Sequence, residues 1–238
     1  MLAVVLFCFK TEVFTFLLAP SEWEFCTYRW IEDSVRVFGM DFHFDKYHVD
    51  LIATDLSSQF MTHITTSCYL ALLCTSPYIL FELFRFISPA LYENEKKYSV
   101  RVVMVYLLFV IGLLMSYFII FPIAFRFLGT YSVDARVTSN ITLDSYINTF
   151  ITLTLVMGVV FQLPIIAFFL SKMGLVTAEM LSKYRKHALI GIMLVAAIIT
   201  PPDLLSLILV TIPLYLLYEV SIKVVKIIER STKQTEKS

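Results

Sequence analysis

The sequence is poor in charged residues and in glycine, and both shortages exclude classes of protein. Only 16% of the 238 residues are charged, whereas a soluble globular chain carries about a quarter. The six glycines are scattered along the chain and cannot form a phosphate-binding loop. Lys plus Arg and Asp plus Glu are equal at 19 each, so the net charge gives no indication of a nucleic-acid partner.

Patterns typical of catalytic and metal sites are missing as well. The four cysteines do not have the spacing of metal ligands. The four histidines stand in different segments, so a ligand set would require the fold to bring them together. We therefore expect a protein that is not an enzyme and that holds no metal or cofactor.

Apolar residues, by contrast, are abundant, at 58% of the chain. A helix that crosses the hydrocarbon core of a bilayer needs about 20 apolar residues, because unpaired backbone amides are costly in lipid. Four stretches satisfy this requirement, at roughly residues 60–88, 100–126, 147–170 and 204–225. The sequence therefore predicts an integral membrane protein with several spans.

Two further segments are shorter than a span. Met1–Phe9 is apolar but would cross only half of the bilayer, and Glu12–Leu18 is expected to lie along the membrane surface. Residues 187–200 would reach only about 21 Å as a helix. They must nevertheless cross, because basic clusters precede this segment and follow the next one, and a Thr200-Pro201-Pro202-Asp203 corner separates the two.

The fold class predicted from these segments is all-α, a polytopic membrane helix bundle with a shortened first span and five further spans. We expect a single transmembrane domain over residues 1–228. Residues 229–238 have the composition of a disordered tail.

Lys and Arg are distributed unequally over the two sides of the predicted spans. Twelve lie on one side: Lys96, Lys97, Arg101, Lys172, Lys183, Arg185, Lys186, Lys223, Lys226, Arg230, Lys233 and Lys237. Five lie on the other side, in or beside the two long loops: Arg29, Arg36, Lys46, Arg126 and Arg136. Because basic residues are retained in the cytoplasm, we expect a cytoplasmic C-terminus and exported long loops.

Polar residues within or beside the spans are candidates for function, since they are costly in lipid. Gln162 precedes Pro164 in the middle of a span and is predicted either to bond within the chain or to dock a partner helix. Glu219 lies in the last span and requires a partner. Asp203 precedes that span, where capping of the free helix amides would explain a carboxylate.

The segment Phe86-Ile87-Ser88-Pro89-Ala90-Leu91-Tyr92-Glu93-Asn94-Glu95-Lys96-Lys97 resembles a loop of the TatC family, the receptor subunit of the twin-arginine protein translocase. Further motifs agree in order over about residues 10–228. They are Ala19-Pro20, Ile52-Ala53-Thr54-Asp55, Phe121-Pro122 at the end of the third span, Lys183-Tyr184-Arg185-Lys186, Thr200-Pro201-Pro202-Asp203 and Ile212-Pro213-Leu214-Tyr215-Leu216-Leu217-Tyr218-Glu219.

The resemblance implies a six-span, cup-shaped receptor in a bacterial cytoplasmic (inner) membrane, or in an organellar one, that exports folded proteins with the proton-motive force. Its implied partners are TatA-like and TatB-like single-span proteins in an oligomeric complex, together with the twin-arginine signal peptides of folded cargo. The implied signal-binding residues are Glu95, Phe86, Leu91, Tyr92, Lys96 and Lys97. The implied partner-helix or structural polar sites are Gln162, Asp203, Glu219 and Pro20.

Two features depart from the family pattern. The family begins with a helix that carries a Glu-Leu-Arg-x-Arg-type signal contact and with a full first span, so we expect either a start upstream of Met1 or a truncated copy. Gln162 stands where many relatives carry glutamate. The alternative function is a small multi-pass solute transporter or channel in which Gln162 and Glu219 line the path, although the repeated halves common in such proteins are not apparent.

Overall fold

The computed structural model describes all residues except 38–48, 88–94, 132–133, 135–139 and 236–238. Within its helices, the side chains of residues 34, 35, 37, 84–87, 95–102 and 231–235 also lie outside the description. The chain divides into two compact units. Unit 1 comprises Met1–Cys74 with Leu114–Thr154, and unit 2 comprises Thr75–Leu113 with Leu155–Ser238.

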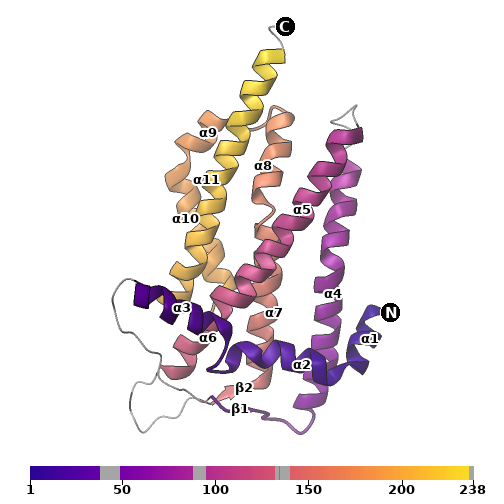
Figure 1. The fold of residues 1–238 in the computed structure, drawn as a ribbon, viewed down its shortest axis with the longest axis vertical. Helices are drawn as coiled ribbons and strands as arrows, with labels where there is room; N and C mark the ends of the chain where they lie inside the picture. Colours follow the sequence, from indigo (N-terminus) through magenta and orange to yellow (C-terminus); the bar gives the residue numbers. More distant parts are fainter. Residues whose placement is uncertain (38–48, 88–94, 132–133, 135–139, 236–238) are drawn as a thin grey trace. The chain divides into compact units, whose positions relative to one another are not determined.

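Unit 1 consists of helices and one pair of very short strands (Figure 1). Its elements are α1 (Leu2–Cys8), α2 (Lys10–Leu18), the 3-10 turn η1 (Ala19–Ser21), α3 (Cys26–Val37), β1 (Leu51–Ile52), the first part of α4 (Ser58–Ile87), the π-helical turn η3 (Ser116–Ile120), α6 (Phe121–Thr130), β2 (Ile141–Thr142) and most of α7 (Leu143–Val160). β1 and β2 pair in parallel and join the two loops that the sequence predicts to be exported. This pairing was not predicted.

Aromatic side chains form much of the core of unit 1. The ring of Phe121 packs edge to face against Phe150 and Tyr146, with centroids 4.9 and 5.1 Å apart. Each such pair contributes about 0.5–1.5 kcal/mol beyond the burial of its area. Val13 and Leu17 of α2, one helical turn apart, are buried in the same cluster, so α2 is attached to unit 1 by one face.

The π-helical turn η3 ends just before Pro122, and this proline alters the hydrogen bonds of the helix there. Proline has no amide hydrogen, so the carbonyl of Phe118, four residues earlier, loses its usual helical partner. The hydroxyl of Thr27 in α3 donates to this carbonyl instead. The next residue, Tyr28, donates its hydroxyl to the carbonyl of Pro122 at 2.9 Å. Two neighbouring side chains thus stabilise the break in the helix.

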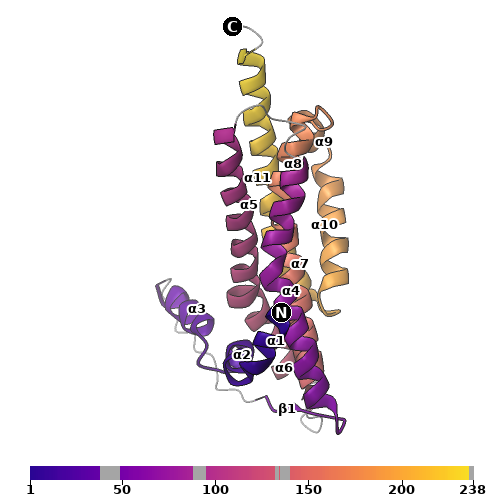
Figure 2. The ribbon, with the colours of Figure 1, turned by 90° about the vertical axis from the view of Figure 1, so that its right-hand side faces the viewer.

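Unit 2 contains the end of α4, α5 (Glu95–Met115) up to Leu113, the end of α7, α8 (Leu163–Lys172), α9 (Ala178–Lys183), α10 (Arg185–Ile199) and α11 (Leu204–Thr235). Both α8 and α10 pack against α11 (Figure 1). Figure 2 shows the short helix α9 at the end of unit 2 where α8 ends. The turn after α8 includes Gly174, whose φ of 74° is rarely adopted by L side chains.

Glycines allow α5 and α7 to approach closely within unit 2. A Cβ atom on Gly112 would lie 2.8 Å from the carbonyl oxygen of Met157 and 3.0 Å from the Cα of Gly158. Small residues at such crossings let two backbones pack directly, which is a common basis of helix association in membranes.

The polytopic helical membrane bundle predicted from the sequence is confirmed. The four long apolar segments appear as Ser58–Leu83, Val103–Thr130, Leu143–Lys172 and Leu204–Arg230. By length and composition, a fifth span among the described residues is counted only if Leu2–Cys8 and Lys10–Asp33, bent by 86°, form one span. The 15-residue α10 is shorter than these segments, and its crossing stays a prediction.

One boundary differs from the prediction. The third span does not end at Phe121-Pro122, because the helix resumes after the π-helical turn and continues as α6 to Thr130. Pro122 stands in the first turn of α6, where a missing amide hydrogen is tolerated. At the other end, α11 is helical as far as Thr235, beyond the predicted domain end at residue 228, and that domain boundary stays a prediction.

Candidate functional site

The loop that carries the family resemblance lies between α4 and α5. Phe86 belongs to the last turn of α4, and Glu95, Lys96 and Lys97 are the first three residues of α5. Leu91 and Tyr92 lie outside the described residues, as do the side chains of Phe86, Glu95, Lys96 and Lys97. The signal-binding arrangement implied by the resemblance therefore stays a prediction.

Gln162 lies at a break between two helices. α7 ends at Val160 and α8 begins at Leu163 with Pro164 in its first turn. The Gln162 side chain is only 1% exposed, and its Nε2 donates to the carbonyl of Val105 in α5 at 3.3 Å. Its Oε1 has no partner among the described residues. The amide thus ties the helix break to α5, and a partner helix could reach Oε1 only if neighbouring side chains moved.

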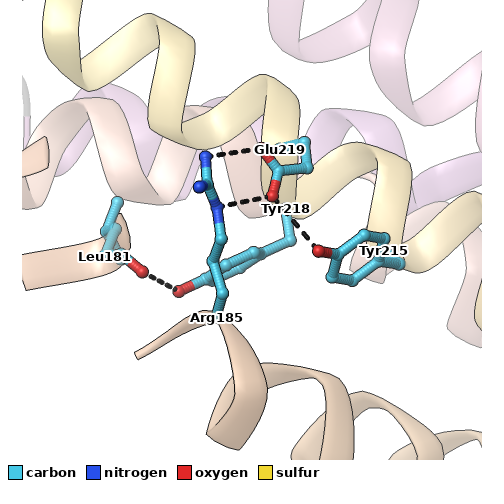
Figure 3. Close-up of polar contacts among 5 residues, drawn as sticks. All are labelled: Leu181, Arg185, Tyr215, Tyr218 and Glu219. Atoms are coloured by element: carbon cyan, nitrogen blue, oxygen red, sulfur yellow. Dashed lines mark hydrogen bonds and ion pairs between the residues drawn. The ribbon is translucent and has the colours of Figure 1, made fainter. Parts of the chain in front are cut away.

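Glu219 of α11 forms a bidentate ion pair with Arg185 at the start of α10 (Figure 3). Arg185 Nε lies 2.8 Å from Oε1 and Nη2 lies 3.0 Å from Oε2. The hydroxyl of Tyr215 donates to Oε1 at 3.3 Å. Two planar groups joined by parallel bonds make a directional contact. The carboxylate, which was predicted to require a partner, therefore has one within the chain.

Further bonds connect the α9 region to α11. The hydroxyl of Tyr218 donates to the carbonyl of Leu181 at 2.8 Å, beside the Arg185–Glu219 pair (Figure 3). The amide of Ala178 donates to Glu229 Oε1 at 2.9 Å. The segment between α8 and α10 is therefore bonded to α11 at two points, Ala178 and Leu181.

Asp203 caps α11. Its Oδ1 accepts a hydrogen bond from the amide of Ser206 at 2.7 Å, at the third helical position, where N-cap carboxylates bond. Its Oδ2 is buried and has no partner among the described residues. The cap orders the turn that joins α10 to α11.

Pro20 is buried in η1 of unit 1, and its carbonyl accepts a long hydrogen bond of 3.4 Å from the Tyr28 hydroxyl. The guanidinium of Arg126 lies 5.1 Å from the centroid of the same tyrosine ring. Pro20 thus lies inside the turn that leads from α2 towards α3, and its role as a structural site stays a prediction.

The structure also reveals polar contacts that sequence analysis missed. Asp144, in the first turn of α7, accepts hydrogen bonds from Ser58, at 2.7 Å, and from Thr62 of α4. The Arg185–Glu219 pair could have been detected from the sequence. Arg185 stands sixteen positions before Pro201, and Glu219 stands seventeen positions after Pro202. In an antiparallel hairpin, nearly equal distances from the turn place two residues at the same level.

Within the described part of the chain, no group of three or more His, Cys, Asp or Glu residues could hold a metal ion. Gln162 and Glu219, which a transporter would need along its path, each have partners inside the chain. Gln162 and Glu219 thus link helices to one another, and no contact among the described residues favours the transporter alternative.

Comparisons with known proteins place these features in a family. The chain matches the family described as TatC, Sec-independent protein translocase protein, over residues 1–213. It is 38% identical to the Sec-independent protein translocase protein TatCy of Bacillus subtilis (strain 168), over 78% of this chain and 73% of that protein. It is 33% identical to the Sec-independent protein translocase protein TatC of Aquifex aeolicus (strain VF5), over 84% of this chain and 90% of that protein.

The fold is also similar to solved structures. A crystal structure described as the twin arginine translocase receptor TatC in DDM matches with a TM-score of 0.74 and 31% identity, over 94% of this chain and 90% of that chain. Another crystal structure of a twin arginine translocase receptor TatC matches with a TM-score of 0.67 and 27% identity, over 94% of this chain and 93% of that chain.

Proposed function

Because the chain belongs to the TatC family of Sec-independent protein translocase proteins, we propose that it is the receptor and core subunit of a twin-arginine translocase. It binds the twin-arginine signal peptides of folded cargo proteins, which cross the membrane with the proton-motive force. The observation that carries this proposal is the family match over residues 1–213, which includes the motif at residues 86–97.

Glu95 is the central residue of the proposed signal site. A pair of guanidinium groups is bound best by a carboxylate in bidentate geometry, and such charge-assisted bonds strengthen at a partly desolvated membrane interface. Phe86, Leu91 and Tyr92 supply the apolar wall beside it. Lys96 and Lys97 make the same loop basic, so the carboxylate is needed to offset their repulsion of a cationic signal.

The proposed receptor works in an oligomeric complex with TatA-like and TatB-like single-span proteins. It lies in a bacterial cytoplasmic membrane with its C-terminus in the cytoplasm, as the distribution of Lys and Arg predicts. Asp203, Glu219 and Pro20 serve as structural polar sites. Gln162 has the same role, which its burial and its bond to Val105 support over docking of a partner helix.

Crosslinking tests the role of Glu95. The parent protein and a Glu95→Ala variant are inserted in membranes, and a twin-arginine signal peptide with a photoreactive group is crosslinked to the loop at residues 86–97. Removal of one partner from a desolvated charge pair costs about 2–5 kcal/mol, so we expect Glu95→Ala to reduce crosslinking by about 30-fold or more.

Glu93→Ala, two residues earlier in the same loop, is the matched control and should have a much smaller effect. A twin-lysine peptide should crosslink poorly to the parent protein. Glu95→Lys should repel the signal without preventing insertion. A stably inserted Glu95→Lys protein that crosslinks the signal as well as the parent does would show that this loop is not the receptor site.

A further inference from the structure

Unit 2 contains an apolar cavity of about 130 Å³ between α5, α8 and α11. Its floor is formed by buried residues of α8, Pro164, Ile165 and Phe169. Its rim is formed by Met104 of α5 and Val220 of α11, which are 56% and 45% exposed. Both rim residues belong to candidate membrane spans, so the cavity opens on a surface that lipid can reach.

The lining of the cavity determines what can enter it. The lining side chains are hydrocarbon or thioether groups that cannot form strong hydrogen bonds. An engineered cavity of about 150 Å³ with a similar lining stays free of water and binds benzene. A cavity of the present volume therefore fits an apolar segment of about six carbon atoms.

Two exposed lysines lie next to the cavity at one end. Lys172 follows Phe168 by four residues on α8, and Lys223 follows Val220 by three residues on α11, so each lysine stands on the face of its helix that lines the cavity. Figure 1 shows α8 and α11 running towards the same end of unit 2. Lysine side chains near helix ends extend to the membrane interface, where they bind anionic headgroups.

We propose that the cavity and the two lysines form a binding site for one anionic phospholipid. A segment of an acyl chain occupies the cavity, and the phosphate group binds Lys172 and Lys223. A helix of a partner protein fits less well, because its diameter of about 10–12 Å is too large for this cavity. A single apolar side chain could enter the cavity, but it would bring no anionic group to the two lysines.

The test uses the purified full-length protein in phosphatidylcholine nanodiscs. The nanodiscs contain a trace of a probe lipid, either phosphatidylglycerol or phosphatidylcholine, that carries a photoreactive diazirine on its acyl chain. Labelled peptides are identified by mass spectrometry. We expect the phosphatidylglycerol probe to label the α8 peptide several-fold more strongly than the phosphatidylcholine probe does. Equal labelling of the parent protein by the two probes would overturn the proposal without any variant.

Variants that fill the cavity test the position of the acyl chain. Val220→Trp on α11 and Met104→Trp on α5 should each reduce labelling of the α8 peptide at least fivefold. Ile212→Trp is the matched control, because Ile212 is 57% exposed on α11 and lies outside the cavity lining. Labelling of the α8 peptide in this variant should equal that in the parent. Undiminished labelling of both filled variants would overturn the proposal.

Variants of the lysines test the headgroup. Each lysine is worth about fivefold in binding an anionic surface, so Lys172→Gln with Lys223→Gln should remove most of the preference for phosphatidylglycerol. Lys183→Gln with Lys186→Gln, exposed elsewhere in unit 2, should preserve it. A single-span partner protein that crosslinks to Val220 and displaces the probe would also overturn the proposal. No signal peptide is used, so the outcome is independent of the proposed function.

Discussion

Glu219 shows how a single residue can be accommodated within a membrane span. An isolated carboxylate there would be costly, but Arg185 and Tyr215 both bind it. The Arg185 side chain remains 46% exposed and that of Glu219 27% exposed. Solvent therefore screens part of the attraction, and we expect this pair to contribute modestly to stability while fixing the position of α10 on α11.

A double-mutant cycle measures the contribution of the pair. We expect Arg185→Ala and Glu219→Ala each to lower the thermal unfolding midpoint, with a coupling free energy of about 1 kcal/mol between them. The double variant should lose less stability than the sum of the single variants, because neither charge then lacks its partner. Lys186→Ala, at the next position, should have little effect. Additive losses would mean that the pair is not coupled.

Gln162 allows packing to be separated from hydrogen bonding. Gln162→Leu preserves most of the side-chain volume, removes the bond to Val105 and also removes the unpaired Oε1, so we expect a change in unfolding free energy within about 1 kcal/mol. Gln162→Ala leaves a cavity at a fully buried position and should cost about 2–3 kcal/mol.

Thermal unfolding in detergent, followed by circular dichroism, compares the two variants. Recovery of TatA-like and TatB-like partners with the Gln162→Leu protein should match that of the parent if the amide serves only within the chain. Selective loss of partners from a Gln162→Leu protein of normal stability would instead assign Gln162 to partner docking.

At the scale of the element, the crossing of α5 and α7 depends on how near the two backbones lie. A Cβ on Gly112 meets backbone atoms of α7, which cannot move independently, whereas a Cβ on Gly158 meets the ring of Phe109 at 2.7 Å and the side chain of Leu113. A side chain can shift more easily than a backbone. The two glycines of one crossing should therefore tolerate substitution differently.

Alanine substitutions test this difference. Gly112→Ala should lower the unfolding free energy by about 1–3 kcal/mol, and Gly158→Ala should lower it less. Gly191 of α10 is the matched control, since a Cβ there meets nothing within 4 Å. Gly191→Ala should be neutral or stabilising by up to about 1 kcal/mol, because alanine favours the helix. Equal losses at Gly112 and Gly191 would exclude close packing as the cause.

At the scale of the whole molecule, the sidedness of the chain is the main prediction. We expect the two long loops to be exported, and the loop between α4 and α5 and the C-terminus to be cytoplasmic, because twelve basic residues lie on that side and five on the other. Such an asymmetry sets orientation during insertion.

Single cysteines introduced into a protein without the native cysteines measure this topology. Asn140→Cys should react with a membrane-impermeant maleimide added from outside intact cells. Lys96→Cys and Lys233→Cys should react only after the cells are opened. External labelling at Lys96→Cys would reverse the predicted orientation.

The sequence by itself determined the membrane class and the family, because both depend on local or ordered information. A span requires only about 20 apolar residues in a row, so the ends of the four long segments were predicted to within five residues. Short motifs in a fixed order indicated the TatC family, which the match over residues 1–213 confirms. Asp203 could be assigned as a cap because its partner is three residues away.

The tertiary structure decided the contacts between residues far apart in the chain. Nothing local to Pro122 predicts that its break is stabilised by Thr27 and Tyr28. Arg185 could be named as the partner of Glu219 only from their nearly equal distances to the turn between α10 and α11, and not from the residues beside Glu219. The parallel pairing of β1 with β2 and the cavity beside Lys172 likewise require segments that meet only after folding. The periodicity of apolar residues says almost nothing about which face of a span packs against protein. A span is hydrophobic both where it faces lipid and where it faces protein, and only packing distinguishes the two faces.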